Sequence, residues 1–240
     1  LVIVSNRVAV PKARGVAGAQ GGMAGALNTA LKESGGLWFG WSGEEADSPD
    51  TSPTIADYDG VTMATIDLSP QEVEEYYNGY ANQTLWPLFH SRIDLAQFER
   101  QTGRGYERVN NRFADALCPL LGNDDIVWVH DYHLIPLGDA LRRRGFGNQL
   151  GFFLHTPWPP TRLLDSLPFH ERLVRTMLAY DLVGFQCDEW LGSFLHYCEH
   201  ELAAEVDEET GEVTLNGRTT AARTYPIGID YEHFTTLGET

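Results

Sequence analysis

The sequence has few cysteines, few positive charges and no long apolar run. Three widely spaced cysteines (Cys118, Cys187 and Cys198) argue against a disulfide framework and favour a reducing compartment. No stretch approaches the roughly 18 apolar residues of a membrane span. No signal peptide precedes the first apolar run, which begins at Leu1 without an initiator methionine. We therefore expect a cytoplasmic protein that makes no membrane contact, and a chain that is part of a longer one.

Motifs for metals and dinucleotides are also missing. Neither C-x-x-C nor H-E-x-x-H occurs in the sequence, so a metal ion has little support, and we expect no cofactor. The complete G-x-G-x-x-G fingerprint is absent too, which weighs against an NAD-dependent oxidoreductase.

Positive charge is scarce: 17 Lys and Arg residues face 34 Asp and Glu residues, and the formal net charge is −17. Such a chain is typical of a solvated acidic surface. It argues against nucleic acid as a partner, because binding a phosphate backbone requires a positive footprint. The same charge repels phosphorylated substrates at long range, so any pocket for a phosphate must be locally basic.

Apolar and amphipathic segments alternate along the 240 residues, enough for one large domain or two small ones. Short apolar runs predict strands at 1–5, 37–41, 61–66, 126–130, 151–155, 182–185 and 223–226. Helical patterns cover 23–33, 107–121, 134–144, 161–180 and 188–205, and a further acidic helix begins with Ser69 as N-cap and Pro70 in its first turn. A polar stretch at 206–220 predicts an exposed hairpin or excursion. The alternation indicates an α/β domain with a doubly wound parallel sheet, whose ligands bind beyond the carboxyl ends of the strands.

Polar and ionisable residues follow three of these strands: Ser5-Asn6-Arg7, His130-Asp131-Tyr132-His133, and His155-Thr156-Pro157. Each set alone could anchor a loop, but three sets at one edge of a sheet predict a binding crevice. Gly21-Gly22 ahead of a helix suits close approach to a phosphate at the helix N-terminus, although a tight turn explains the pair equally well.

Aromatic residues gather in two places. In the strand at 37–41, alternation puts Trp38 and Phe39 on opposite faces; Trp41, on the face of Phe39, either packs in the core or stacks on a sugar. The second group lies along and after the acidic helix and comprises Tyr76, Tyr77, Asn78, Tyr80 and Trp86. Rings with polar tips suit a half-wet pocket, and a hinge between surface and core is the alternative.

Together these segments resemble the trehalose-6-phosphate synthases, retaining glycosyltransferases of family 20 with the two-domain GT-B fold. The matching segments span essentially the whole chain, in order: Val4-Ser-Asn-Arg7, Gly21-Gly22, Gly36-Leu-Trp-Phe-Gly-Trp-Ser-Gly43, Tyr76-Tyr-Asn78, Leu85-Trp-Pro87, Val129-His-Asp-Tyr-His-Leu134, Gly151-Phe-Phe-Leu-His155, Asp181-Leu-Val-Gly-Phe-Gln186 and Tyr225-Pro-Ile-Gly-Ile229. Met23 and Trp158 stand where Leu and Phe are commoner. The resemblance implies that residues 1–240 form the N-terminal, Rossmann-like, acceptor-binding domain, and that the donor-binding domain lies outside this chain.

The resemblance also implies an acceptor pocket for glucose 6-phosphate. Arg7 would bind the phosphate, a role that suits a guanidinium fork. Trp41, Tyr77 and Trp86 would line the pocket, and Asp131 would accept hydrogen bonds from the sugar hydroxyls.

For the donor, UDP-glucose, the resemblance implies contacts from Gly21, Gly22 and His155. With Asp131 and His155 as catalytic residues, the implied reaction transfers glucose to the anomeric hydroxyl of glucose 6-phosphate with retention, giving α,α-trehalose 6-phosphate and UDP. The family is usually described without a protein nucleophile, so Asp131 orients the acceptor and the leaving phosphate helps to deprotonate it. We expect the 240 residues alone to bind glucose 6-phosphate weakly and to turn over nothing measurable.

Two alternatives stay open on the sequence. A related family enzyme would use another acceptor, as a glucosylglycerol-phosphate synthase does, and a non-catalytic regulatory subunit of a trehalose synthase complex would share the fold. The presence of Arg7, Trp41, Tyr77 and Asp131 favours a phosphorylated hexose and a catalytic role. A homo-oligomer and a part in osmoprotection are further expectations.

Overall fold

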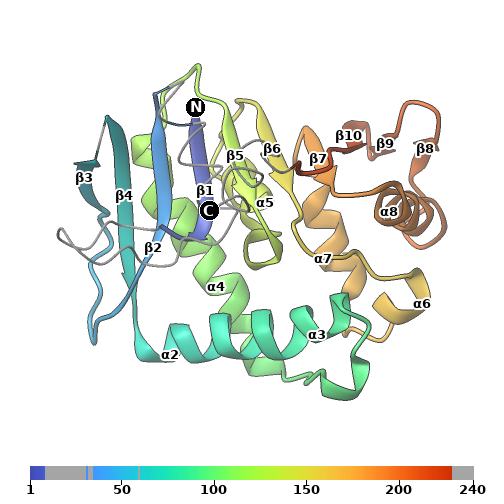
Figure 1. Cartoon of the computed structure of the whole chain (residues 1–240), viewed down its shortest axis with the longest axis horizontal. Helices are drawn as coiled ribbons and strands as arrows, with labels where there is room; N and C mark the ends of the chain where they lie inside the picture. The colour runs from blue at the N-terminus through green and yellow to red at the C-terminus, as the bar shows by residue number, and fades with distance from the viewer. Residues whose placement is uncertain (9–30, 32–34, 59, 229–240) are drawn as a thin grey trace, which may run out of the picture.

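Ten strands form one sheet through the middle of the molecule, in the order β3-β4-β2-β1-β5-β6-β7-β10-β9-β8. The computed structural model describes residues 1–8, 31, 35–58 and 60–228, and Figure 1 shows the strands side by side. The strands are β1 (Val2–Arg7), β2 (Leu37–Glu45), β3 (Thr54–Tyr58), β4 (Val61–Leu68), β5 (Val127–His130), β6 (Leu150–Phe153), β7 (Leu182–Phe185), β8 (Glu205–Asp207), β9 (Glu212–Leu215) and β10 (Arg218–Thr224).

The strands from β4 through β10 in this order run parallel, whereas β3, β9 and β8 pair antiparallel with their neighbours. The chain first lays β2 and β4 on one side of β1, then returns to place β5, β6, β7 and β10 on the other. This reversal puts a topological switch point between β1 and β5, where open α/β sheets bind ligands. The predicted doubly wound, mostly parallel sheet is confirmed.

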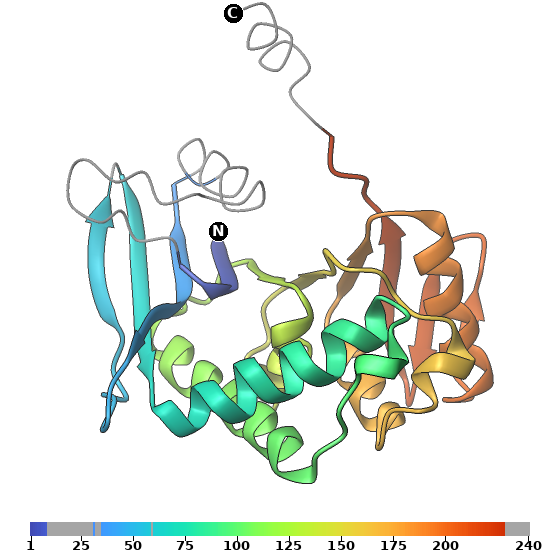
Figure 2. The ribbon, with the colours of Figure 1, turned by 60° about the horizontal axis from the view of Figure 1, so that its bottom comes forward.

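Helices connect these strands. They are α2 (Pro70–Glu72), η1 (Val73–Leu85), α3 (Trp86–Phe89), α4 (Arg100–Leu117), α5 (Leu137–Arg143), α6 (Thr161–Leu164), α7 (His170–Met177) and α8 (Asp188–His200), with short turns η2 (Ile93–Leu95), η3 (Cys118–Leu120) and η4 (Tyr132–Leu134). The segments α2, η1 and α3 are continuous, and Figures 1 and 2 show them crossing the molecule from the end of β4. Among the described residues, no helix has the length and apolar character that crossing a membrane requires.

The start of this crossing segment follows from its first residues. The Ser69 Oγ accepts the backbone N–H of Glu72 at 3.2 Å, and the Glu72 carboxylate accepts the backbone N–H of Ser69 at 2.8 Å. This reciprocal capping box satisfies two helix-end donors, and Pro70 stands where its missing N–H is no loss. The predicted N-cap is confirmed.

Other boundaries differ from the prediction. The single helix predicted at 161–180 is wrong: α6 ends at Leu164 and α7 begins at His170, because Pro168 cannot continue a helical hydrogen-bond ladder and Phe169 has a φ of 62°. The strand predicted at 151–155 ends at Phe153, so His155 lies in the loop beyond it. The helix predicted at 107–121 starts earlier, as α4, and β3 was not predicted.

The predicted hairpin in the polar stretch is confirmed, and it belongs to the sheet. β9 pairs antiparallel with the first half of β10, joined at Asn216 and Gly217. Both residues have positive φ (53° and 79°), as a tight two-residue hairpin turn requires. The predicted helix at 23–33 lies outside the described residues, apart from Leu31.

The two faces of β2 pack as alternation predicted. Phe39 and Trp41 join the larger apolar core, while Trp38 joins a second cluster on the opposite face with Ile3 and Met63. The buried Trp38 indole donates its N–H to the Ser5 Oγ at 2.8 Å, so its polar atom is satisfied. β1 is thereby fixed at the centre of the sheet by packing on both faces.

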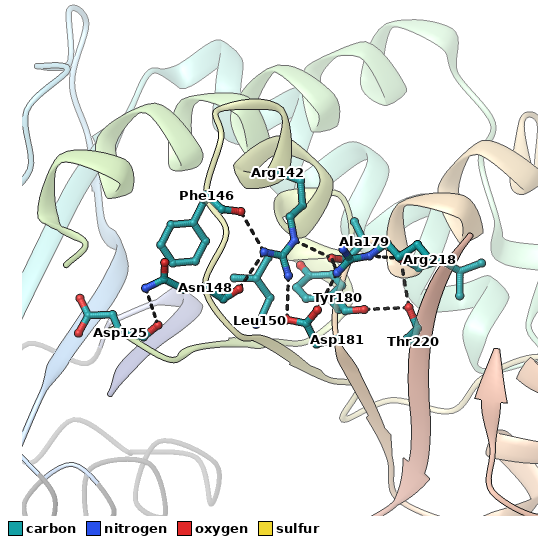
Figure 3. A network of polar contacts seen from close by, with 11 residues as sticks. Asp125, Arg142, Phe146, Asn148, Leu150, Ala179, Tyr180, Asp181, Arg218 and Thr220 are labelled. Carbon is teal, nitrogen blue, oxygen red and sulfur yellow. Dashed lines mark hydrogen bonds and ion pairs between the residues drawn. The ribbon is translucent and has the colours of Figure 1, made fainter. Parts of the chain in front are cut away.

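A polar network at the amino ends of β6, β7 and β10 ties that edge of the sheet together (Figure 3). The Asp181 carboxylate accepts from the Arg142 and Arg218 guanidinium groups, each at 2.7 Å, and from the backbone N–H of Leu150 at 2.8 Å. Because this end of the strands is opposite to the predicted crevice, the network serves the fold.

Asp181→Ala should therefore lower the free energy of unfolding by about 2 kcal/mol, since it strips the charge partner of two arginines and a backbone donor. The loss stays this small because the Asp181 side chain is 43% exposed, so water screens its charge. Chemical denaturation would measure the change, with the exposed Asp124→Ala as control. A loss no larger than that of the control would contradict the role.

Candidate functional site

The crevice at the switch point begins where β1 ends. Arg7 closes β1, and its guanidinium carbon lies over Trp41, 5.8 Å from the ring centroid. Beside it, the Asn6 side-chain carbonyl accepts a hydrogen bond from the Tyr76 hydroxyl at 2.7 Å, which ties the end of β1 to η1. The cation–π contact holds a positive charge at the end of β1. Such a local positive charge is what an otherwise acidic chain needs in order to bind a phosphate.

An aromatic wall continues from Arg7 along η1. Trp41 and Tyr77 meet edge to face with ring centroids 5.5 Å apart, and Tyr77 stacks on His133 at 5.7 Å with an interplanar angle of 16°. Trp41 donates its indole N–H to the Glu44 carbonyl at 2.8 Å. Trp41 is only 6% exposed, whereas Tyr77 is half-buried. Trp41 therefore packs mainly in the core and supports both Arg7 and the more accessible Tyr77.

Gly43 has no side chain, and the Arg7 guanidinium occupies the space where a side chain would be. Gly43 has a φ of +87°, and a Cβ built there would overlap the Arg7 guanidinium. Gly43→Ala should displace Arg7 from Trp41, and calorimetry with glucose 6-phosphate, the ligand that the sequence resemblance implies, should show binding to the full-length protein weakened about tenfold.

A matched control for this substitution is Gly60→Ala. Gly60 also has a positive φ (+80°), yet among the described residues nothing lies within 4 Å of its Cβ position. Both variants thus carry the same backbone penalty, and only Gly43→Ala crowds Arg7. Equal affinities for the two variants would show that Arg7 is not held by this contact.

Asp131 directly follows β5 in a strained backbone conformation. Its φ of 75° and ψ of 166° lie in a region that residues other than glycine rarely adopt. Its carboxylate accepts the backbone N–H of His155 at 3.2 Å, and its own N–H donates to the Phe153 carbonyl at 2.8 Å. Burial raises the pKa of Asp131 to about 6, against the opposing effect of the backbone N–H groups of Tyr132, His155 and Thr156. Near pH 7 the carboxyl is therefore mainly ionised and can accept hydrogen bonds from hydroxyl groups.

Three histidines, His130, His133 and His155, belong to the loops that follow β5 and β6 or to the end of β5 itself. The His130 Nδ1 lies 3.0 Å from the His155 Nε2, a hydrogen bond between two imidazoles. Burial lowers the pKa of His130 to about 3 and that of His155 to about 4, and the neighbouring His155 adds to the shift of His130. Burial likewise lowers the pKa of His133 to about 3. All three rings are therefore neutral near pH 7, and Arg7 supplies the fixed positive charge of this wall.

Trp86 lies farther along the crossing helix, on α3. It is 42% exposed and stacks on His90, with ring centroids 4.1 Å apart. His90 lies close enough to Asp131 for its charge to lower the pKa of that carboxyl. Trp86 is therefore connected to the crevice through His90. A role for His90 was not predicted from the sequence, although its position four residues after Trp86 indicates that the two side chains meet.

The aromatic group predicted along the acidic helix divides between two sides. Tyr77 faces Trp41, whereas Tyr76 and Tyr80 both pack on Tyr106 of α4, with ring centroids 5.9 Å and 4.7 Å apart. Ring contacts join Arg7, Trp41 and Tyr77 at the end of β1, and a hydrogen bond joins Asp131 and His155 beyond the neighbouring strands β5 and β6. Gly21 and Gly22 lie outside the described residues. In the part of the chain that the structure describes, no group of three or more His, Cys, Asp or Glu side chains could hold a metal ion.

Known proteins are similar to this chain in sequence. The trehalose-6-phosphate synthase of Sinorhizobium fredii is 46% identical over 236 residues, which are 98% of this chain and 50% of that protein. Trehalose-6-phosphate synthase from Escherichia coli is 43% identical over 230 residues, 96% of this chain and 48% of that protein. The chain thus spans about half the length of these curated relatives.

Solved structures of trehalose-phosphate synthases are similar to this chain in fold as well. A UDP-forming α,α-trehalose-phosphate synthase from Burkholderia xenovorans in complex with glucose-6-phosphate superposes with a TM-score of 0.90 at 42% identity, covering 99% of this chain and 52% of that one. An E. coli structure bound with UDP-2-fluoro glucose gives a TM-score of 0.89 at 39% identity, covering 100% and 51%. The family model of glycosyltransferase family 20 matches residues 1–239. The chain therefore belongs to glycosyltransferase family 20.

Proposed function

We propose that the full-length protein transfers glucose from UDP-glucose to glucose 6-phosphate with retention, giving α,α-trehalose 6-phosphate and UDP. The observation that carries this proposal is that Arg7 lies over Trp41, which in turn meets Tyr77, at the end of β1, while Asp131 directly follows the neighbouring strand β5 of a family 20 sheet. A positive fork, an aromatic surface and a hydroxyl acceptor are the groups that a sugar phosphate needs.

Recognition of the acceptor divides among these groups. The Arg7 guanidinium donates two parallel hydrogen bonds to the phosphate, which offsets the repulsion from a chain of net charge −17. Tyr77 and Trp86 pack against the sugar, and Trp41 supports Arg7 and Tyr77 from behind. Asp131, ionised near pH 7, accepts from the sugar hydroxyls and fixes the orientation of the attacking one.

The donor contacts are shared with the part of the protein outside this chain. His155 lies beside the transferred glucose, and Gly21 and Gly22 approach the donor phosphates. Asp131 orients rather than attacks: the leaving phosphate oxygen takes the proton of the acceptor hydroxyl on the same face, so the protein contributes positioning and charge stabilisation. Asp131 and His155 are the residues we place at the reaction centre.

We further propose that residues 1–240 are the acceptor-binding domain of a two-domain enzyme. On this view the chain alone binds glucose 6-phosphate weakly and transfers no glucose, because most donor contacts come from the other domain. A cytoplasmic location, assembly into homo-oligomers and a part in osmoprotection belong to the same proposal.

The test is product analysis with the full-length protein. UDP release should depend on glucose 6-phosphate, and NMR of the product should show an α,α-linkage. UDP release with glycerol 3-phosphate but not with glucose 6-phosphate would show that the acceptor is not glucose 6-phosphate and would favour a glucosylglycerol-phosphate synthase. The absence of UDP release with either acceptor would favour a regulatory subunit.

A further inference from the structure

His130 is a buried ionisable residue to which the proposed reaction assigns no task. Its side chain is 1% exposed and packs against Trp128, with ring centroids 4.4 Å apart. Its Nδ1 reaches the His155 Nε2 at 3.0 Å, whereas its buried Nε2 has no hydrogen-bond partner among the described residues. Because only one of its two ring nitrogens has a hydrogen-bond partner, the tautomer of the neutral His130 ring can be inferred.

Two arrangements of the neutral pair are conceivable. If His155 donated from Nε2, His130 would carry its proton on Nε2, where it would be a buried N–H without an acceptor. If His130 donates from Nδ1, only an unshared electron pair on Nε2 stays unpaired. Buried N–H groups without a partner are rarer in proteins than under-satisfied acceptors. The second arrangement is therefore favoured, and it leaves the proton of His155 on Nδ1.

The position of the His155 ring is fixed from two sides as well. The ring meets Phe153 edge to face at 4.8 Å and His130 at 5.3 Å. The register of the sheet sets this geometry, because β5 pairs with β6 so that His130 is opposite Phe153, two residues before His155. His155 itself is half-buried and lies in the loop beyond β6.

We propose that His130 is a positioning residue for glucosyl transfer: its Nδ1–H holds His155 in the orientation and tautomer that present an Nδ1–H donor to the sugar nucleotide. This inference rests on the proposed function. An N–H held toward the sugar nucleotide contributes to the transition state of glucosyl transfer and not to the binding of the acceptor, so its loss lowers kcat more than it weakens acceptor binding.

Three substitutions at position 130 in the full-length protein separate positioning from packing. Asn keeps an amide N–H near the place of Nδ1, Gln moves its amide outward by one bond, and Phe keeps the ring but has no donor. Packing predicts stability in the order Phe, Gln, Asn, because Asn leaves the largest cavity. Positioning predicts the highest activity for the least stable variant, with H130N within about threefold of wild type and with H130Q and H130F both about tenfold lower in kcat. The KM for glucose 6-phosphate should stay unchanged in all three.

A double-mutant cycle supplies the second readout. If His130 acts through His155, H130F should cause no further loss of kcat in a His155→Ala background. An additive loss, or activities that follow the order of stability, would overturn the inference while the proposed function stood. If the wild-type protein transferred no glucose, the proposed function would fail instead. The 15N shifts of His155 would then still decide the inference, since a proton on Nε2 would contradict it.

Discussion

Arg7→Ala in the full-length protein should raise the KM for glucose 6-phosphate about a hundredfold and leave the KM for UDP-glucose nearly unchanged. Two charge-assisted hydrogen bonds from a guanidinium fork to a phosphate contribute about 3 kcal/mol, which corresponds to that factor. The surrounding chain makes the loss severe, because a net charge of −17 offers no general attraction for a phosphorylated sugar. Steady-state kinetics with each substrate varied in turn would measure both constants.

Two variants control this experiment. Arg7→Lys keeps the charge but loses the fork and the stacking on Trp41, so its KM should fall between those of wild type and Arg7→Ala. Arg92→Ala removes an exposed arginine that pairs with Asp94 at 2.8 Å on η2, and it should leave both KM values unchanged. An unchanged acceptor KM in Arg7→Ala would remove Arg7 from the phosphate role.

Much of this fold was predictable because its signals are local. The β-branched run before Arg7 and the apolar run before His130 mark buried parallel strands, and Ser69-Pro70 marks a helix start. Such patterns depend on neighbours in sequence. The break between α6 and α7 was missed although Pro168 is a local signal, because the flanking segments keep a helical apolar period.

The site was predictable only in part. A rule about strand ends locates Arg7 and Asp131, because the carboxyl ends of parallel strands meet at one edge of the sheet. The contact between His130 and His155 depends on the register of β5 against β6, which no local pattern specifies. The strained backbone of Asp131 is likewise invisible in the sequence, since it is imposed by the surrounding loops.

Asp131→Asn should make the protein more stable at pH 8 and reduce its kcat about a hundredfold. Burial raises the pKa of Asp131 from 3.8 to about 6, so the folded state binds more protons than the unfolded state between these pH values. Wild-type stability therefore falls as pH rises through about 4 to 6, by up to about 3 kcal/mol, and stays reduced above that range. The Asn variant escapes this penalty and loses the charged acceptor that orients the sugar.

The pH dependence of stability distinguishes the burial of a charge at Asp131 from the backbone strain at the same residue. Denaturation of wild type and Asp131→Asn at several pH values should give a difference that vanishes below about pH 3, where the Asp131 carboxyl is neutral in both the folded and the unfolded state. Asp124→Asn, at an exposed position, should show no such trend. Asp131→Gly also relieves the backbone strain at φ 75°, so part of its gain should persist at about pH 3. A pH-independent gain for Asp131→Asn would mean that the buried carboxylate charge does not lower the free energy of unfolding. The strained backbone at this position would then be the cause of the lower stability.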